Sequence, residues 1–246
     1  MNSQETSVPS IDVGPECPYQ AYIDDFLRQH GLHRIIAFCG GSDEQLEGVK
    51  DKNLQARYSE VMEAKQVAVL EDAMSQFQGF RVAILTGGTE GGVPERATTI
   101  AKRLGLATIG ILPATGAKFS LGYDSTIGRQ LLDLKIIVHP STGESAWGDE
   151  SPVLTKLLDG AIVYGGSAGT LIEIAHLLKM NDKRIKKGSV PKYIVPISGS
   201  GGVADGLPFV WSKPHVLARS LPKKLITSGR EAARFLIENL DIEFYL

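Results

Sequence analysis

A run of small residues between an apolar segment and an amphipathic one is the feature that most limits the fold of this sequence. The run is Gly165–Thr170, inside GAIVYGGSAGTLIEIAHLL at Gly160–Leu178. The preceding Ala161–Tyr164 has the composition of a buried strand, and apolar residues recur at helical spacing after the run. A strand that turns through glycines into a helix leaves N–H groups unpaired at the helix start, where the helix dipole also favours an anion. The stretch predicts a phosphate site or, if its glycines serve only close packing, a plain turn.

Similar apolar runs alternate with helical patterns along the rest of the chain. Buried strands are also expected at 33–39, 81–85, 106–112, 135–138 and 193–197, and residues 224–226 are a candidate seventh strand. Further helices are expected at 19–30, 59–77, 95–104, 126–132, 151–159 and 231–240. Strands that alternate with helices imply right-handed crossovers and a parallel sheet covered on both faces. We therefore predict a Rossmann-like, doubly wound α/β fold.

Length and composition indicate one large domain. The chain has 246 residues, of which 43% are hydrophobic, and this suffices for a single α/β core. Residues 1–18 are polar and contain three prolines, which predicts a flexible leader. Residues 19–246 are then the single Rossmann-like domain.

Charge and cysteine content exclude several classes of partner. A formal net charge of −2 argues against nucleic-acid binding by bulk electrostatics. The two cysteines, without paired histidines, suggest no metal site, and no cofactor is predicted. Neither a signal peptide nor an apolar segment of membrane-spanning length is visible, so we expect a cytoplasmic protein without a membrane partner.

Glycine and serine runs follow four of the expected strands. In a parallel sheet these strand ends lie along one edge, where α/β proteins bind their ligands. Several such turns on one edge favour a nucleotide or phosphosugar ligand. The candidate ligand- and phosphate-binding residues are Gly40, Gly41, Ser42, Gly87, Gly88, Thr89, Gly91, Gly92, Gly166, Ser167, Gly169 and Thr170.

Two sharper phosphate motifs are absent from the sequence. No G-x-x-x-x-G-K-[ST] segment occurs, which excludes a Walker-type loop. The run Gly87–Gly92 (GGTEGG) does not fit G-x-G-x-x-G, and no strand-end acid follows about twenty residues later to bind a ribose. A conventional nicotinamide dehydrogenase is therefore disfavoured.

Three motifs together resemble a known family. Phe38–Ser42 (FCGGS), Gly87–Gly92 (GGTEGG) and Gly166–Glu173 (GSAGTLIE) are similar, in this order, to landmarks of the LOG family within the SLOG superfamily. LOG proteins are cytokinin-activating phosphoribohydrolases, and the resemblance covers roughly Ile35–Ser198. It implies a bound nucleoside 5′-monophosphate, with phosphate on the glycine turns and ribose near Glu173. It also implies a homo-oligomer, to which the 59–77 helix would contribute.

The resemblance leaves two functions open. LOG enzymes carry an arginine on the helix before the fifth strand, and the equivalent segment Gly148–Leu158 contains none. The favoured hypothesis is a SLOG-type protein that binds a nucleotide or nucleotide-derived ligand. The alternative is a phosphoribohydrolase in which Glu173 is the catalytic acid and stabilises an oxocarbenium-like state. In that case Glu144, Asp149 or His139 would supply its partner, so whether the chain is an enzyme stays open.

Three single residues carry their own expectations. We expect Cys39 to behave as a small buried hydrophobe and His176 to pack or cap, so neither is a candidate catalytic group. Gly169 is expected to tolerate no side chain, because a turn of this kind demands close backbone approach or a positive φ.

Overall fold

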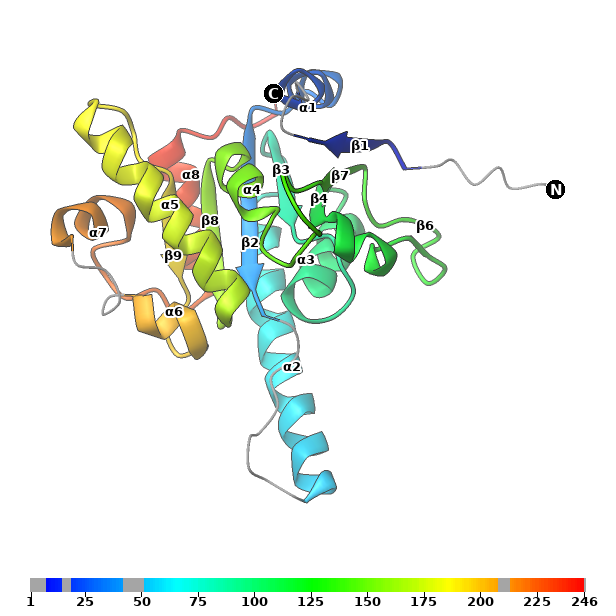
Figure 1. The fold of residues 1–246 in the computed structure, drawn as a ribbon. Helices are drawn as coiled ribbons and strands as arrows, with labels where there is room; N and C mark the ends of the chain where they lie inside the picture. The colour runs from blue at the N-terminus through cyan, green and yellow to red at the C-terminus, as the bar shows by residue number, and fades with distance from the viewer. Residues whose placement is uncertain (1–7, 15–18, 42–50, 208–212, 246) are drawn as a thin grey trace.

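A seven-stranded parallel sheet forms the centre of the computed structural model, which describes residues 8–14, 19–41, 51–207 and 213–245 (Figure 1). The strand order is β1-β7-β4-β3-β2-β8-β9, and neighbouring strands pair in parallel. The strands are β1 (Ser10–Val13), β2 (Arg34–Gly40), β3 (Val82–Thr86), β4 (Ala107–Pro113), β7 (Leu134–Val138), β8 (Gly160–Tyr164) and β9 (Tyr193–Pro196). The predicted Rossmann-like α/β fold is confirmed.

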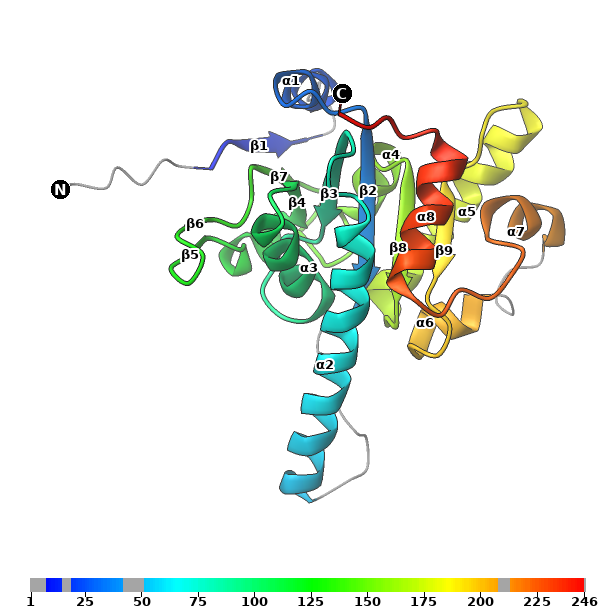
Figure 2. The ribbon, with the colours of Figure 1, turned by 180° about the vertical axis from the view of Figure 1, so that it is seen from behind.

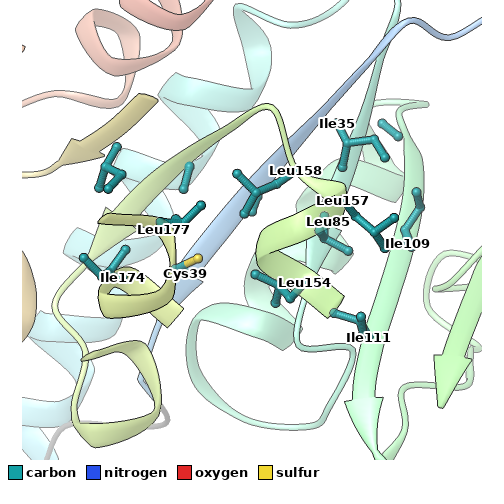
Figure 3. Close-up of a cluster of buried hydrophobic side chains, with 14 of the residues drawn as sticks. Ile35, Cys39, Leu85, Ile109, Ile111, Leu154, Leu157, Leu158, Ile174 and Leu177 are labelled. Atoms are coloured by element: carbon teal, nitrogen blue, oxygen red, sulfur yellow. The ribbon is translucent and has the colours of Figure 1, made fainter. Parts of the chain in front are cut away.

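Helices cover both faces of this sheet (Figures 1 and 2). Central parallel strands are apolar at successive positions because both of their faces are buried. Along β2, Ile35 and Cys39 join one core cluster, which Figure 3 shows, and Ile36 and Phe38 join the other. The first cluster is covered by α1 (Tyr19–Gln29), α4 (Ser151–Leu157), α5 (Ala168–Lys186), α6 (Gly202–Gly206) and α7 (Pro214–Ser220). The second is covered by α2 (Lys52–Ser75), α3 (Gly92–Arg103) and α8 (Gly229–Leu240).

The order of the strands reverses at β2. From β2 the chain adds β3, β4 and β7 on one side, and then returns to place β8 on the other side of β2. The register pairs Gly40 with Tyr164, so β2 and β8 end side by side. Loops that leave two such strands in opposite directions open a crevice, the usual ligand position in doubly wound folds.

Residues 10–13 differ from the prediction that residues 1–18 form a flexible leader, of which residues 1–7 and 15–18 lie outside the described part of the chain. Residues 10–13 form β1, which lies at the sheet edge and pairs with β7. Backbone hydrogen bonds run from the Lys135 amide to the Pro9 carbonyl at 2.9 Å and from the His139 amide to the Val13 carbonyl at 2.8 Å. A four-residue edge strand with a single buried side chain, Val13, carries too little apolar signal to be distinguished from a polar arm.

Two local assignments from the sequence are wrong. Residues 126–132 do not form a helix: β5 (Tyr123–Asp124) pairs antiparallel with β6 (Arg129–Gln130). The Asp124 carboxylate accepts from the Thr126 amide at 2.7 Å and hydroxyl at 2.6 Å, an Asx-type turn that competes with a helix. At 224–226 the structure has only an isolated bridge between Ile197 and Ile226, followed by the turn into α8.

The longest helix, α2, starts earlier than predicted. The Asp51 carboxylate caps it, accepting from the amides of Asn53 at 2.9 Å and Leu54 at 3.3 Å. The first turns project beyond the carboxyl edge of the sheet (Figure 1), and Leu54 and Val61 are exposed there. Because this part contacts no core, it lacks the apolar stripe from which the helix was predicted.

Candidate functional site

A cavity of about 610 Å³ lies at the carboxyl ends of β2, β3 and β8. Its position is the crevice expected at the reversal of strand order, and its size is typical of small-molecule sites. The lining residues are Gly40, Gly41, Gly87, Thr89, Glu90, Gly91, Pro94, Pro113, Phe119, Trp147, Glu150, Ser167, Gly169, Thr170 and Glu173. Three glycine turns that are far apart in the sequence thus meet at one place.

Most of the candidate residues border this cavity, and three do not. Gly88, Gly92 and Gly166 are absent from its lining and instead shape the backbone. Gly88 has φ +65°, and a Cβ there would lie 2.8 Å from the Gly110 Cα, so this glycine permits close packing of the β3 turn on β4. Ser42 lies outside the described residues.

The segment after β9 makes hydrogen bonds to the turn after β8 and stabilises it. Val203 and Ala204, at the start of α6, donate backbone hydrogen bonds to the carbonyls of Gly166 and Gly165, both at 3.0 Å. The Gly165 amide donates to the Ser200 hydroxyl at 2.8 Å. Ser198–Gly202 (SGSGG), the glycine and serine run after β9, is absent from the cavity lining and instead braces the turn after β8.

The start of α5 borders the cavity without a side-chain cap. Ser167 is the N-cap residue, and no side chain hydrogen-bonds to this end of the helix among the described residues. Ser167, Gly169 and Thr170 all line the cavity. A helix of 19 residues therefore presents its unpaired amides and the positive end of its dipole to the cavity.

Gly169 does not meet the expectation that it excludes a side chain. A Cβ built there contacts nothing within 4 Å, and its φ is not positive. The strained position is Gly166, with φ +99°, where a Cβ would lie 2.6 Å from the Thr170 Oγ1. The sequence places both glycines in one turn, but only the backbone geometry distinguishes their roles.

Glu173, on the second turn of α5, is the titratable group at the centre of the site. Burial in the cavity raises the pKa of its carboxyl to about 7, and the nearby Glu150 carboxylate adds to the rise. The Cys39 thiol opposes it by hydrogen-bonding to Glu173. Cys39 is buried at the end of β2 as expected, but it also contacts the candidate acid and is more than a small hydrophobe.

A second wall of the cavity was not foreseen from the sequence. Phe119 comes from the end of η1 (Ala114–Phe119), a 3₁₀ helix after β4, and Trp147 and Glu150 come from the loop after β7. The two rings lie nearly parallel, with centroids 6.4 Å apart and an interplanar angle of 26°. These residues stand in irregular segments without a glycine signature. Their only signal is the presence of aromatic side chains in polar surroundings.

The charged side chains of the cavity are all acidic. Glu90, Glu150 and Glu173 line it, and no lysine or arginine does so within the described ranges. Burial is the main cause of a raised pKa at Glu150, with a smaller contribution from Asp149. An anion bound here would rest on backbone amides, and the carboxyls favour a ligand that also carries hydrogen-bond donors.

The other residues considered as partners of Glu173 lie elsewhere. The His139 ring contacts the Asp12 carboxylate at 2.9 Å beside β1, and Glu144 is exposed. Asp149 accepts from the Ala146 amide at 2.8 Å and stabilises the turn before α4. His176 is exposed on α5 rather than packed. Glu150 is the acidic neighbour that the structure gives to Glu173.

Gly165–Gly169 (GGSAG) also fits the G-x-S-x-G spacing of a nucleophile elbow. An elbow serine sits on a strained turn beside a histidine base. Ser167 instead has an extended backbone, with φ −120° and ψ −151°, and no described histidine lines the cavity. The geometry does not support a serine hydrolase.

The described part of the chain shows neither a metal-binding cluster nor a helix that could span a membrane. No group of three or more His, Cys, Asp or Glu side chains there is arranged to hold a metal ion. No helix in the same ranges combines the length and apolarity needed to cross a membrane.

Comparison with known proteins agrees with this fold. Residues 78–187, which include β3, β8 and all of α5, match the model of the SLOG cluster4 family. The SLOG resemblance is confirmed. No curated protein matches the chain.

Solved structures show a similar fold beyond the matched segment. The molybdenum cofactor binding protein of Rippkaea orientalis has a TM-score of 0.52 at 19% identity, over 85% of this chain and 97% of that one. The molybdenum cofactor carrier protein of Chlamydomonas reinhardtii has a TM-score of 0.51 at 18% identity, over 85% and 98%. The structural-genomics target TM1055 has a TM-score of 0.54 at 18% identity, over 84% and 99%. At these identities the likeness shows the fold.

Proposed function

We propose that this chain binds a nucleotide or nucleotide-derived small molecule in the 610 Å³ cavity. One observation carries the proposal: the glycine turns after β2, β3 and β8 meet at the reversal of strand order, beside the uncapped start of α5. The ligand phosphate lies on the amides of Ser167–Thr170, and Glu173 accepts from a ribose hydroxyl. Two structural neighbours are named for binding the molybdenum cofactor, which supports a small-molecule ligand for this fold.

The alternative function is hydrolysis of the N-glycosidic bond of a nucleoside 5′-monophosphate. It is favoured by the pKa of Glu173, about 7, because a carboxyl poised near neutral pH suits acid–base work. It is disfavoured by the acidic lining, because no described cationic side chain there pairs with Glu173 as the LOG arginine would. Binding without hydrolysis is the proposed outcome.

Glu173→Gln distinguishes the two functions. If Glu173 only binds, glutamine keeps an acceptor, and affinity falls by about 1–2 kcal/mol. If it is catalytic, the rate falls by about 2–3 orders of magnitude while binding stays nearly intact. Calorimetry with AMP and GMP measures the first quantity, and chromatographic detection of released base measures the second. We expect no base release by the wild type. Glu238→Gln, an exposed change on α8, is the matched control.

We also propose a homo-oligomer. At the projecting start of α2, the side chains of Leu54 and Val61 are 51% and 66% exposed. Apolar side chains exposed on a helix that packs against no core are unfavourable in water. A second copy of the chain would cover this face. We expect light scattering at micromolar concentration to give at least twice the 26.5 kDa of one chain. Leu54→Glu combined with Val61→Glu should return the mass to that of one chain, and a wild-type mass near 26.5 kDa would contradict the proposal.

A further inference from the structure

The aromatic wall of the cavity provides a stacking surface. Phe119 and Trp147 are 43% and 58% exposed although they line a concave site, so their faces are not consumed by core packing. The six-membered ring of Trp147 lies over Gly116, where a Cβ would come within 3.0 Å of its Cη2. Large aromatic faces left open beside a polar site favour a planar ligand ring.

The loop that carries Trp147 fixes a carboxyl next to this surface. The Glu150 Oε2 accepts from the Gly148 amide at 2.9 Å, and the Ser151 amide donates to the Gly148 carbonyl at 3.1 Å. Gly148 has φ +105°, which the tight turn requires. Trp147 and Glu150 therefore form one pre-ordered unit, and the remaining lone pairs of the Glu150 carboxylate are available to a ligand.

Hydrogen-bonding chemistry then selects the ring. A carboxylate only accepts, so the ring edge that faces Glu150 must donate. Adenine offers one amino group beside an acceptor nitrogen, which would oppose the carboxylate. Guanine offers a ring N–H and an adjacent exocyclic amino group, which together make two parallel charge-assisted bonds to one carboxylate. Among the described residues the charged side chains that line the cavity are all carboxylates, which favours a ring edge that donates over one that only accepts.

We propose that the ligand is a guanine nucleotide, with its base stacked on Phe119 and Trp147 and its N–H edge on Glu150. This inference rests on the proposed function, since the phosphate lies at the start of α5. It assigns base recognition to Glu150 and Trp147 and leaves Glu173 to the ribose. Glu150 acts here as a specificity residue, because a site built to pair with N–H groups rejects analogues that lack them.

Calorimetry with GMP, IMP and AMP tests the proposal. IMP keeps the ring N–H of GMP but lacks its amino group, so it isolates one of the two bonds. We expect GMP to bind about tenfold or more tightly than IMP and AMP. Glu150→Gln retains an oxygen for the Gly148 amide but pairs poorly with guanine, and should reduce this preference to about threefold or less. Glu238→Gln should leave it unchanged.

A second measurement reports the stacking directly. In a Trp211→Phe background Trp147 is the sole tryptophan, and GMP should quench its fluorescence. Trp147→Leu should weaken GMP, IMP and AMP by a similar factor, whereas Tyr123→Leu, an exposed aromatic outside the cavity, should not. Equal affinities for AMP and GMP, or an undiminished preference in Glu150→Gln, would overturn the guanine inference alone. No binding of any of the three nucleotides at millimolar concentration would overturn the proposed function as well.

Discussion

Gly166→Val is expected to destabilise the fold by about 2–4 kcal/mol, while Gly169→Val leaves the fold intact and removes ligand binding. At Gly166 the φ of +99° is unfavourable for any side chain, and the new Cβ would overlap Thr170. The Gly166 carbonyl also accepts from the Val203 amide, so the turn cannot relax without losing its brace. At Gly169 the added side chain enters open space inside the cavity.

Urea unfolding and calorimetry with GMP separate the two effects. Gly169→Val should keep an unfolding free energy within about 1 kcal/mol of the wild type and bind GMP more than about tenfold more weakly, because the side chain occupies the phosphate position. A loss of stability in Gly169→Val equal to that in Gly166→Val would show that the turn differs from the geometry described. Normal GMP binding by Gly169→Val would show that the phosphate does not lie at the start of α5.

Glu173→Gln is expected to stabilise the protein above pH 7 by about 1–3 kcal/mol and to have little effect near pH 4. The native carboxyl has a pKa of about 7, against an ordinary value near 4.5. Between these two values the unfolded chain has released the proton that the native protein still holds. Wild-type stability therefore falls as the pH rises through this window, and glutamine, which does not titrate, removes that loss.

Urea denaturation at several pH values between 4 and 8 measures this difference. The gap between Glu173→Gln and wild type should open between about pH 4.5 and 7 and stay constant above. Glu238→Gln, with an exposed carboxylate, should show no such gap. A difference of the same size at pH 4 and pH 8 would mean that glutamine acts through packing rather than through the buried charge.

The central strands and the glycine turns are predictable because they rest on local patterns. Runs such as Ile35–Cys39 and Ala161–Tyr164 are apolar at every position, as strands buried on both faces must be. Glycine clusters directly after such runs indicate the ligand edge, and the cavity includes Gly41, Gly87 and Gly169 from three of them. These features need no knowledge of which strands are neighbours.

Features that depend on which distant segments lie side by side could not be predicted from the sequence. The adjacency of Gly40 and Tyr164 follows from the strand order, which periodicity does not encode. Phe119 and Glu150 reach the cavity from segments that follow β4 and β7, two strands that do not neighbour β2 or β8 in the sheet. The raised pKa of Glu173 depends on burial beside Cys39, a contact between residues 134 positions apart.

Because α6 braces the turn after β8, the segment that matches the family model is shorter than the part of the chain needed to fold the site. The family segment ends at residue 187, but Ser200, Val203 and Ala204 hold the turn that it contains. Both sheet neighbours of β8, namely β2 and β9, also lie outside residues 78–187. A fragment cut at residues 78 and 187 would carry two of the three family-like motifs, and both edges of its β8 would be unpaired. Domain transplantation or library design in this protein must therefore use borders that include β2 and α6.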